Sequence, residues 1–250
     1  MIRLLQFIYS LYAFLLFALV IILLAPLVIL VLPLGRIRGG NLMYDIFRVC
    51  AKVWLYLVGI HHTTRYAGPK PSAQEQFIFI ANHISYLDAI VIIPSVKHHF
   101  RPIGKYELMK IPIFGFIYKF CVITVNRSSA EDRARSLDDL RKVLARGISI
   151  LVFPEGTFNE SKNALKEMYD GAFKLAVETG KKIQPILLLD TFDRLHFRSV
   201  FLLTPGRSRA IYLDPIDPAD HPHADHKGLK AIAEKIMSEK LSEYKVSWMR

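Results

Sequence analysis

The sequence contains little cysteine, no run of basic residues and no glycine-rich phosphate loop. Its 250 residues include two cysteines, Cys50 and Cys121, and both lie among apolar residues. Two isolated thiols in such surroundings predict buried free cysteines of a reducing compartment rather than a disulfide or a metal pair. The missing phosphate loop argues against a nucleotide-binding protein of that class.

Acidic residues are outnumbered, although the positive charge is dispersed. The chain has 33 Lys and Arg against 22 Asp and Glu, a formal net charge of +11. Such a balance favours an anionic partner, either nucleic acid or the negatively charged face of a membrane. The basic residues are scattered, and the sequence carries no zinc-finger or RNA-recognition signature. We therefore predict a membrane partner and no nucleic acid.

Charge is absent altogether from residues 4–34. A helix over residues 4–25 would be about 33 Å long at ~1.5 Å per residue, enough to cross a hydrocarbon core of ~30 Å. The run is about twice as long as the apolar part of a signal peptide, so we predict an uncleaved membrane anchor. It could span the membrane fully or kink at Pro26 and re-enter, and the sequence leaves both open.

The next segment, residues 41–60, predicts a helix with a polar face. Asp45, Arg48 and Lys52 fall on one side, and apolar residues cover the rest. This pattern fits a helix in the membrane interface, with its cations toward the head groups and Trp54 at the boundary. An ordinary amphipathic helix packed on the domain fits equally well. We divide the chain into an anchor with an interfacial helix, residues 1–65, and a second domain, residues 66–250, because Gly68 and the prolines after it punctuate the chain.

After residue 71, short β-branched or aromatic runs alternate with helical patterns. Strands are predicted over residues 77–81, 122–125, 148–153, 183–189 and 209–213. Helices are predicted over residues 86–93, 131–145, 172–179 and 227–244. The alternation predicts an α/β fold with a mostly parallel central sheet flanked by helices, behind the N-terminal helical membrane anchor, and with its site at the carboxyl ends of the strands.

A histidine and a carboxylate, His83 and Asp88, follow the first of these strands. On one regular helix an offset of five residues would separate them by roughly 140°. They can meet only if His83 lies in the turn and Asp88 lies in the first turn of the helix. Ser85 followed three residues later by Asp88 reads as a capping box and predicts a helix start near Tyr86. The spacing therefore suggests a general base with its orienting acid, although Asp88 could simply cap the helix and His83 could be structural.

A second motif, Phe153-Pro154-Glu155-Gly156-Thr157, occurs far along the chain. Together with His83-x4-Asp88 it resembles the glycerolipid acyltransferase family, which includes bacterial 1-acyl-glycerol-3-phosphate acyltransferases. The resemblance runs over residues 77–186. It implies a membrane-bound enzyme, with its site on the cytoplasmic face, that moves a fatty acyl group from acyl-coenzyme A or acyl carrier protein to the free hydroxyl of lysophosphatidate. The hydroxyl belongs to the acceptor lipid, so no serine nucleophile and no acyl-enzyme are expected.

The resemblance also implies roles for further residues. It puts Glu155, Gly156 and Thr157 on a loop that faces the histidine–aspartate pair, where glycine lets backbone approach the substrate closely. We count Asn82 and Lys105 as substrate ligands too, although Lys105 fits a solvated loop lysine equally well.

Arginine suits a phosphate because its fork is planar. Arg127, at the end of a family-like block, is therefore the predicted ligand of the acceptor's phosphate. Many members have arginine directly after the second motif, whereas this chain has Phe158. One phosphate contact is thus missing or is supplied by another cation, for which the candidates are Lys162, Lys166 and Lys174. Alternatives are another lysolipid or acylated amino acid as acceptor, and a non-catalytic membrane-binding module.

A histidine-rich segment near the C-terminus resembles a metal-binding site. His221, His223 and His226 stand close together beside Asp220 and Asp225. Such histidines occur in zinc sites, but the segment is rich in Pro and Asp and precedes a predicted helix. We interpret it as a solvated loop, and we predict neither a metal nor a cofactor.

Overall fold

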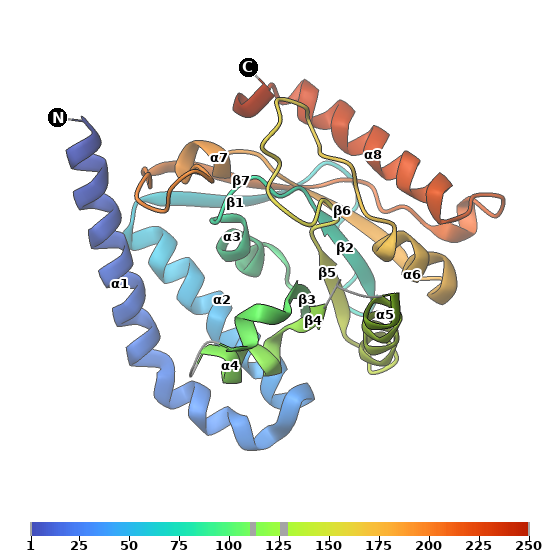
Figure 1. The fold of residues 1–250 in the computed structure, drawn as a ribbon, viewed down its shortest axis with the longest axis horizontal. Helices are drawn as coiled ribbons and strands as arrows, with labels where there is room; N and C mark the ends of the chain where they lie inside the picture. The colour runs from blue at the N-terminus through green and yellow to red at the C-terminus, as the bar shows by residue number, and fades with distance from the viewer. Residues whose placement is uncertain (1, 111–113, 126–129, 250) are drawn as a thin grey trace.

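The chain is described by a computed structural model that covers residues 2–110, 114–125 and 130–249. Within these residues the strands form one seven-stranded sheet in the order β1-β7-β6-β2-β5-β3-β4 (Figure 1). The strands are β1 (Ile60–Tyr66), β2 (Phe77–Ala81), β3 (Phe100–Lys105), β4 (Ile123–Val125), β5 (Ser149–Val152), β6 (Lys182–Leu188) and β7 (Gly206–Tyr212). Only β6 and β7 are antiparallel neighbours, and the other neighbouring pairs are parallel. The predicted α/β class with a mostly parallel sheet is confirmed.

Strand β2 is the centre of the sheet and is covered on both faces. All five of its residues are buried. Successive side chains point to opposite faces, so Ile78 and Ile80 enter one core while Phe77 and Phe79 enter the other. A strand that is buried on both faces reads as a continuous apolar run, which is why its bounds match those predicted.

Helices form the two outer layers. They are α1 (Ile2–Val31), α2 (Gly40–Leu57), α3 (Asp88–Ser95), α4 (Phe114–Cys121), α5 (Ala130–Leu144), α6 (Gly171–Thr179), α7 (Thr191–Arg194) and α8 (His226–Glu243). Helices α5, α6 and α8 cover the face that holds Ile78 and Ile80, whereas α2, α3 and α4 cover the other (Figure 1).

Four of the helices and strands of the described residues were not predicted from the sequence: β1, β3, α4 and the single-turn helix α7. β1 lies at the edge of the sheet and alternates buried with exposed residues, so it lacks an apolar run. β3 contains Pro102 and Gly104, both of which disfavour a strand in sequence-based reasoning. Helix α3 begins at Asp88 rather than near Tyr86, and α2 ends at Leu57 rather than at residue 60.

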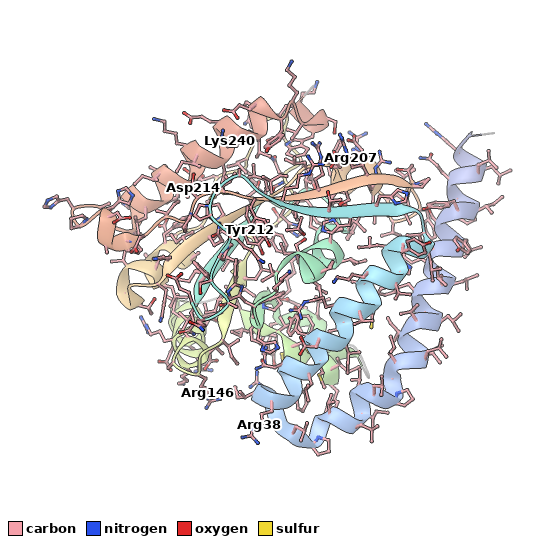
Figure 2. The ribbon with its side chains drawn as sticks, turned by 180° about the vertical axis from the view of Figure 1, so that it is seen from behind. Arg38, Arg146, Arg207, Tyr212, Asp214 and Lys240 are labelled. Carbon is pink, nitrogen blue, oxygen red and sulfur yellow. The ribbon has the colours of Figure 1, made fainter. Side chains whose placement is uncertain are left out.

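Helices α1 and α2 lie side by side as a hairpin, with Arg38 at the turn between them (Figure 2). Helix α1 runs on through Pro26 to Val31. The indole Nε1 of Trp54 donates a hydrogen bond to the carbonyl of Ala13 at 2.9 Å. The Ser10 hydroxyl, which is fully buried, accepts from the backbone of Leu203 at 3.1 Å. One side of α1 is therefore fixed to α2 and to the domain.

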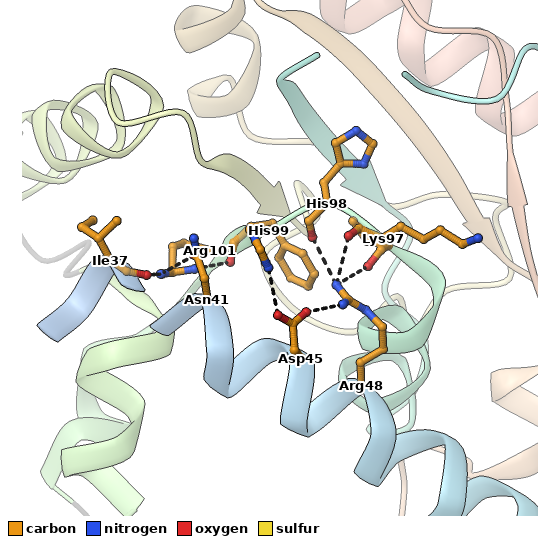
Figure 3. Close-up of polar contacts among 10 residues, drawn as sticks. Ile37, Asn41, Asp45, Arg48, Lys97, His98, His99 and Arg101 are labelled. Atoms are coloured by element: carbon orange, nitrogen blue, oxygen red, sulfur yellow. Dashed lines mark hydrogen bonds and ion pairs between the residues drawn. The ribbon is translucent and has the colours of Figure 1, made fainter. Parts of the chain in front are cut away.

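Asp45 and Arg48 of the polar face of α2 point toward the domain (Figure 3), whereas Lys52 is exposed. Arg48 pairs with Asp45 at 2.6 Å and donates to the carbonyls of residues 96–98, while Asp45 also pairs with His99. Arg101 reaches the turn before α2 through the carbonyl of Ile37 and binds the side chain of Asn41. Of the two interpretations that the sequence left open for this helix, packing on the domain accounts for Arg48, because its guanidinium binds loop carbonyls of the domain rather than facing lipid head groups.

The opposite side of the hairpin is apolar and exposed. The exposed large side chains include Leu4, Leu5, Ile8, Leu15, Leu19, Ile22, Leu23 and Leu30 on α1, and Leu42, Val49, Val53, Tyr56 and Leu57 on α2. By length and composition, one helical stretch of the described residues, Arg3–Leu57, could cross a membrane. A contiguous apolar surface of this kind marks a partner or membrane contact. The division into 1–65 and 66–250 stays a prediction, and strand β1 runs across that position.

Both cysteines are free thiols. Cys121 is buried, with its Sγ 3.5 Å from the Sδ of Met43, and burial raises its pKa to about 12. Cys50 lies on α2 and is only partly buried. The expectation of buried free thiols is confirmed fully for Cys121 and in part for Cys50.

Candidate active site

His83 and Asp88 meet at the carboxyl end of β2. The ring Nδ1 of His83 lies 2.9 Å from Oδ2 of Asp88, and the two side chains are 20% and 0% exposed. This leaves Nε2 as the ring atom that can take a proton from a substrate, and no hydrogen bond within the described residues occupies it. The two residues are brought together as the spacing predicted, with His83 before the helix and Asp88 at its start.

A turn of backbone holds Asp88 in place. Its Oδ2 also accepts from the backbone N–H groups of Ile84 at 2.7 Å and Ser85 at 2.8 Å. The Ser85 hydroxyl accepts from the backbone of Leu87 at 3.0 Å. The carboxylate reaches back to the N–H of Ser85 as a capping box would require, but α3 begins only at Asp88, after Leu87, and no side chain caps it, so the predicted capping box is not formed. One oxygen thus orients the imidazole and holds the turn before α3, while Oδ1 has no partner in the described structure.

The segment after β5 wraps around His83 on several sides. The ring of Phe153 stacks on the imidazole at 4.3 Å between centroids, and Phe158 meets it edge-on at 4.5 Å. The backbone N–H of Asn159 donates to the carbonyl of His83 at 2.8 Å. Because β5 is the parallel neighbour of β2, the two strands deliver both motifs to the same edge of the sheet. The motifs, 70 residues apart in the chain, therefore form one site.

Glu155 links that segment to His83 through backbone. Its Oε1 accepts from the N–H of His83 and its Oε2 from the N–H of Lys166, each at 2.7 Å. The side chain is 1% exposed. Burial raises its pKa from 4.5 to about 7, against the opposing effect of the two N–H donors. Both oxygens accept hydrogen bonds within the protein, so Glu155 positions the backbone of His83 rather than contacting a substrate.

This pKa predicts a pH-dependent effect of Glu155→Gln on stability. Between pH 4.5 and 7 the folded protein holds the proton that the unfolded chain loses, so the carboxyl's contribution to unfolding free energy falls as pH rises. The quantity compared is the unfolding free energy of the wild type minus that of Glu155→Gln. We expect this difference to fall by about 3 kcal/mol as the pH rises from 4.5 to 7. Denaturant unfolding of both proteins in detergent, from pH 4.5 to 8, measures the difference and cancels all other titrating groups. A difference that grows with pH would mean that the two N–H donors outweigh burial.

The other predicted ligands occupy different kinds of position. Asn82 is 1% exposed, and its amide binds both the carbonyl and the N–H of Leu188, which ties the end of β2 to β6 and uses the amide oxygen and one amide hydrogen within the protein. Gly156 has φ +73°, a conformation that favours glycine, and its N–H donates to Phe153 in the turn. Thr157 is exposed and accepts from the ammonium of Lys166 at 2.7 Å.

The remaining two candidates are basic. Lys105 lies exposed at the end of β3, and no hydrogen bond or ion pair of the described residues joins it to His83. Arg127 lies outside the described residues, so its role stays a prediction. Residues 221–226 gather no metal-binding group among the described residues, and His226 lies 4.0 Å from Asp170.

Sequence reasoning missed the aromatic residues of the site. Tyr86 is 47% exposed and meets Phe158 edge-on at 4.7 Å, and Phe197, from the chain after α7, lies 6.5 Å from Phe158. Tyr86 lies within the first motif and Phe158 directly follows the second, so both could have been suspected from their position. Nothing in the sequence near Phe197 connects it to either motif, since only the fold brings it there.

The fold and the edge of the sheet where the two motifs meet are those of an α/β enzyme. The model of the family described as Acyltransferase matches residues 62–189, just over half of the chain. The chain belongs to this acyltransferase family, which confirms the resemblance seen in its motifs.

The chain is an acyltransferase similar to 1-acyl-sn-glycerol-3-phosphate acyltransferases. It is 28% identical over 208 residues to the enzyme of that name from Borreliella burgdorferi, which covers 82% of each chain. It is 27% identical over 180 residues to the one from Haemophilus influenzae, covering 69% of this chain and 72% of that one. The crystal structure of the 1-acyl-sn-glycerophosphate acyltransferase PlsC from Thermotoga maritima shares the fold, with a TM-score of 0.75 at 22% identity over 99% of this chain and 100% of that one.

Proposed function

We propose that the protein transfers a fatty acyl group from acyl-coenzyme A or acyl carrier protein to the free hydroxyl of lysophosphatidate, which makes phosphatidate. The hydrogen bond between His83 and Asp88, at the edge where the second motif surrounds the imidazole, carries this proposal. The names of the relatives support the choice of acceptor.

Two residues take part in the chemical steps of this transfer, His83 as the base and Asp88 as its charge partner. Nε2 of His83 removes the proton as the acceptor hydroxyl attacks the thioester carbon, and Asp88 stabilises the imidazolium that forms. The tetrahedral intermediate then collapses and expels the donor's sulfur, which takes the proton back from His83 as a thiol. The new ester bond replaces the thioester bond, so the chemistry needs neither a covalent enzyme intermediate nor a redox partner.

The same proposal places the enzyme on a membrane, with the site on its cytoplasmic face. The exposed apolar side of α1 and α2 supports this, because lipid would cover a surface that water does not favour. Arg36 and Arg38, exposed at the turn of the hairpin, suit anionic lipid head groups. Both substrates and the product partition into the same surface, so attachment there would raise the rate of encounter.

An acceptor panel tests the proposed function. Purified protein with labelled acyl-coenzyme A should acylate lysophosphatidate at least about 10-fold faster than monoacylglycerol, because a charge-assisted contact to phosphate contributes on the order of a tenfold preference. The same panel with acyl carrier protein as donor identifies the thioester carrier. Equal or greater turnover of the neutral acceptor would refute lysophosphatidate as the substrate.

A second candidate is an acceptor without a phosphate, such as another lysolipid or an acylated amino acid. The observation in its favour is Phe158, which lies against His83 and Tyr86 and gives this side of the site an apolar surface. A lysolipid panel that includes an N-acyl amino acid separates this candidate from the first.

A further inference from the structure

Lys166 is held beside the base by one buried carboxylate. Glu155 accepts from the backbone of His83 with one oxygen and from the backbone of Lys166 with the other, at 2.7 Å each. The chain that follows is fixed too, since Tyr169 donates to the carbonyl of Pro154 at 2.9 Å. The backbone of Lys166 therefore keeps a set distance from that of His83, even though its side chain is exposed.

The ammonium of Lys166 lies at the second motif and forms no ion pair within the described residues, although its charge acts on the buried Glu155. Its Nζ donates to the hydroxyl of Thr157 at 2.7 Å. Thr157 is the direct neighbour of Phe158, whose ring touches the imidazole. A free positive charge and a hydroxyl thus stand together at the rim of the site.

The rest of that rim is aromatic rather than basic. Phe153 and Phe158 flank the imidazole, and Tyr86 extends the ring cluster outward. Neither motif contains a lysine or an arginine, and Lys166 is the cation that a hydrogen bond joins to the second motif in the described structure. An ammonium binds phosphate as a point charge, and a hydroxyl can donate to a phosphate oxygen.

We infer that Lys166 and Thr157 form the site for a phosphate group of the substrate, with Glu155 and Tyr169 fixing the chain that carries the lysine. The phosphate belongs to the acceptor, as its phosphomonoester, and the hydroxyl of Thr157 turns to donate to it while Nζ provides the charge. Coenzyme A also carries phosphates, so the same chemistry could come from the donor. The inference rests on the proposed function and names a residue for its acceptor specificity.

The test compares three variants. Lys166→Met removes the charge at similar length, Lys166→Arg keeps it, and Lys235→Met removes an exposed lysine of α8 that has no role in the site. We expect Lys166→Met to raise KM for lysophosphatidate about 10-fold or more, with kcat changed less than about 3-fold. Lys166→Arg should restore KM to within about 3-fold of wild type, and Lys235→Met should match wild type. KM for acyl-coenzyme A should not change in any variant.

Other outcomes overturn the inference. A rise in KM for acyl-coenzyme A alone would assign the phosphate to the donor, and equal effects of Lys166→Met and Lys235→Met would deny a specific site. A loss of kcat that Lys166→Arg fails to restore would give the lysine a structural role. Failure of the proposed function itself is recognised separately, because the wild-type enzyme would then not acylate lysophosphatidate before any variant is compared.

Discussion

Replacing His83 with alanine should lower kcat for acyl transfer by about 10³-fold, within the range of ~10²–10⁴ that a positioned general base contributes. The Nε2 of the imidazole makes no hydrogen bond within the described residues, while Nδ1 is held by Asp88 at 2.9 Å. Without it, the acceptor hydroxyl must lose its proton to water. Initial rates at saturating donor and acceptor measure the loss. KM for either substrate should change little, since the ring is expected to act in the chemical step.

Two controls make this result specific to the site. His223→Ala removes an exposed histidine of the loop before α8 and should leave kcat at the wild-type value. The far-ultraviolet circular dichroism of His83→Ala should match wild type, because the backbone N–H and carbonyl of residue 83 still bind Glu155 and Asn159. A His83→Ala protein that folds and turns over within about 10-fold of wild type would be inconsistent with general-base catalysis there.

Replacing Asp88 should separate charge from geometry. In Asp88→Asn the amide oxygen can occupy the position of Oδ2, because two backbone N–H groups and the ring Nδ1 all require an acceptor there. The amide nitrogen then takes the place of Oδ1, which has no partner to lose. The imidazole keeps its orientation but loses the negative charge that stabilises the imidazolium. We expect kcat to fall about 10²-fold, less than the ~10⁴-fold seen when the wrong tautomer results.

Asp88→Ala should be worse in both activity and stability. It leaves the N–H groups of Ile84 and Ser85 unsatisfied in a buried turn, at about 1–3 kcal/mol each. We expect a loss of about 3 kcal/mol or more in unfolding free energy, and kcat below that of Asp88→Asn. Thermal melting and initial rates of the two variants give the comparison. Equal activity in both would mean that Asp88 acts through its charge alone and that its hydrogen bonds do not position the base.

The sequence predicted the central part of the fold well because that part depends on burial. β2 is buried on both faces, and its apolar run has the bounds that the structure shows. The edge strand β1 and the proline-containing β3 carry no such run, so their strand conformation comes from pairing with β7 and β5. The sequence left the orientation of the polar face of α2 open for a related reason. A charged stripe has the same pattern whether it faces lipid head groups or, as Arg48 does, loop carbonyls of the domain.

The amino-acid sequence by itself determined the fold class, the family and the encounter of His83 with Asp88, because these depend on periodicity and on the short turn between strand and helix. It also indicated that the second motif belongs to the same site. Only the tertiary structure decided that Glu155 and Asn82 spend their polar groups on backbone, that Phe197 joins the aromatic cluster, and that Lys166 stands at Thr157. These contacts join residues that are far apart in the chain. A local sequence pattern cannot predict them, because neighbouring parallel strands are joined by long crossover connections and their order decides which distant segments meet at one edge of the sheet.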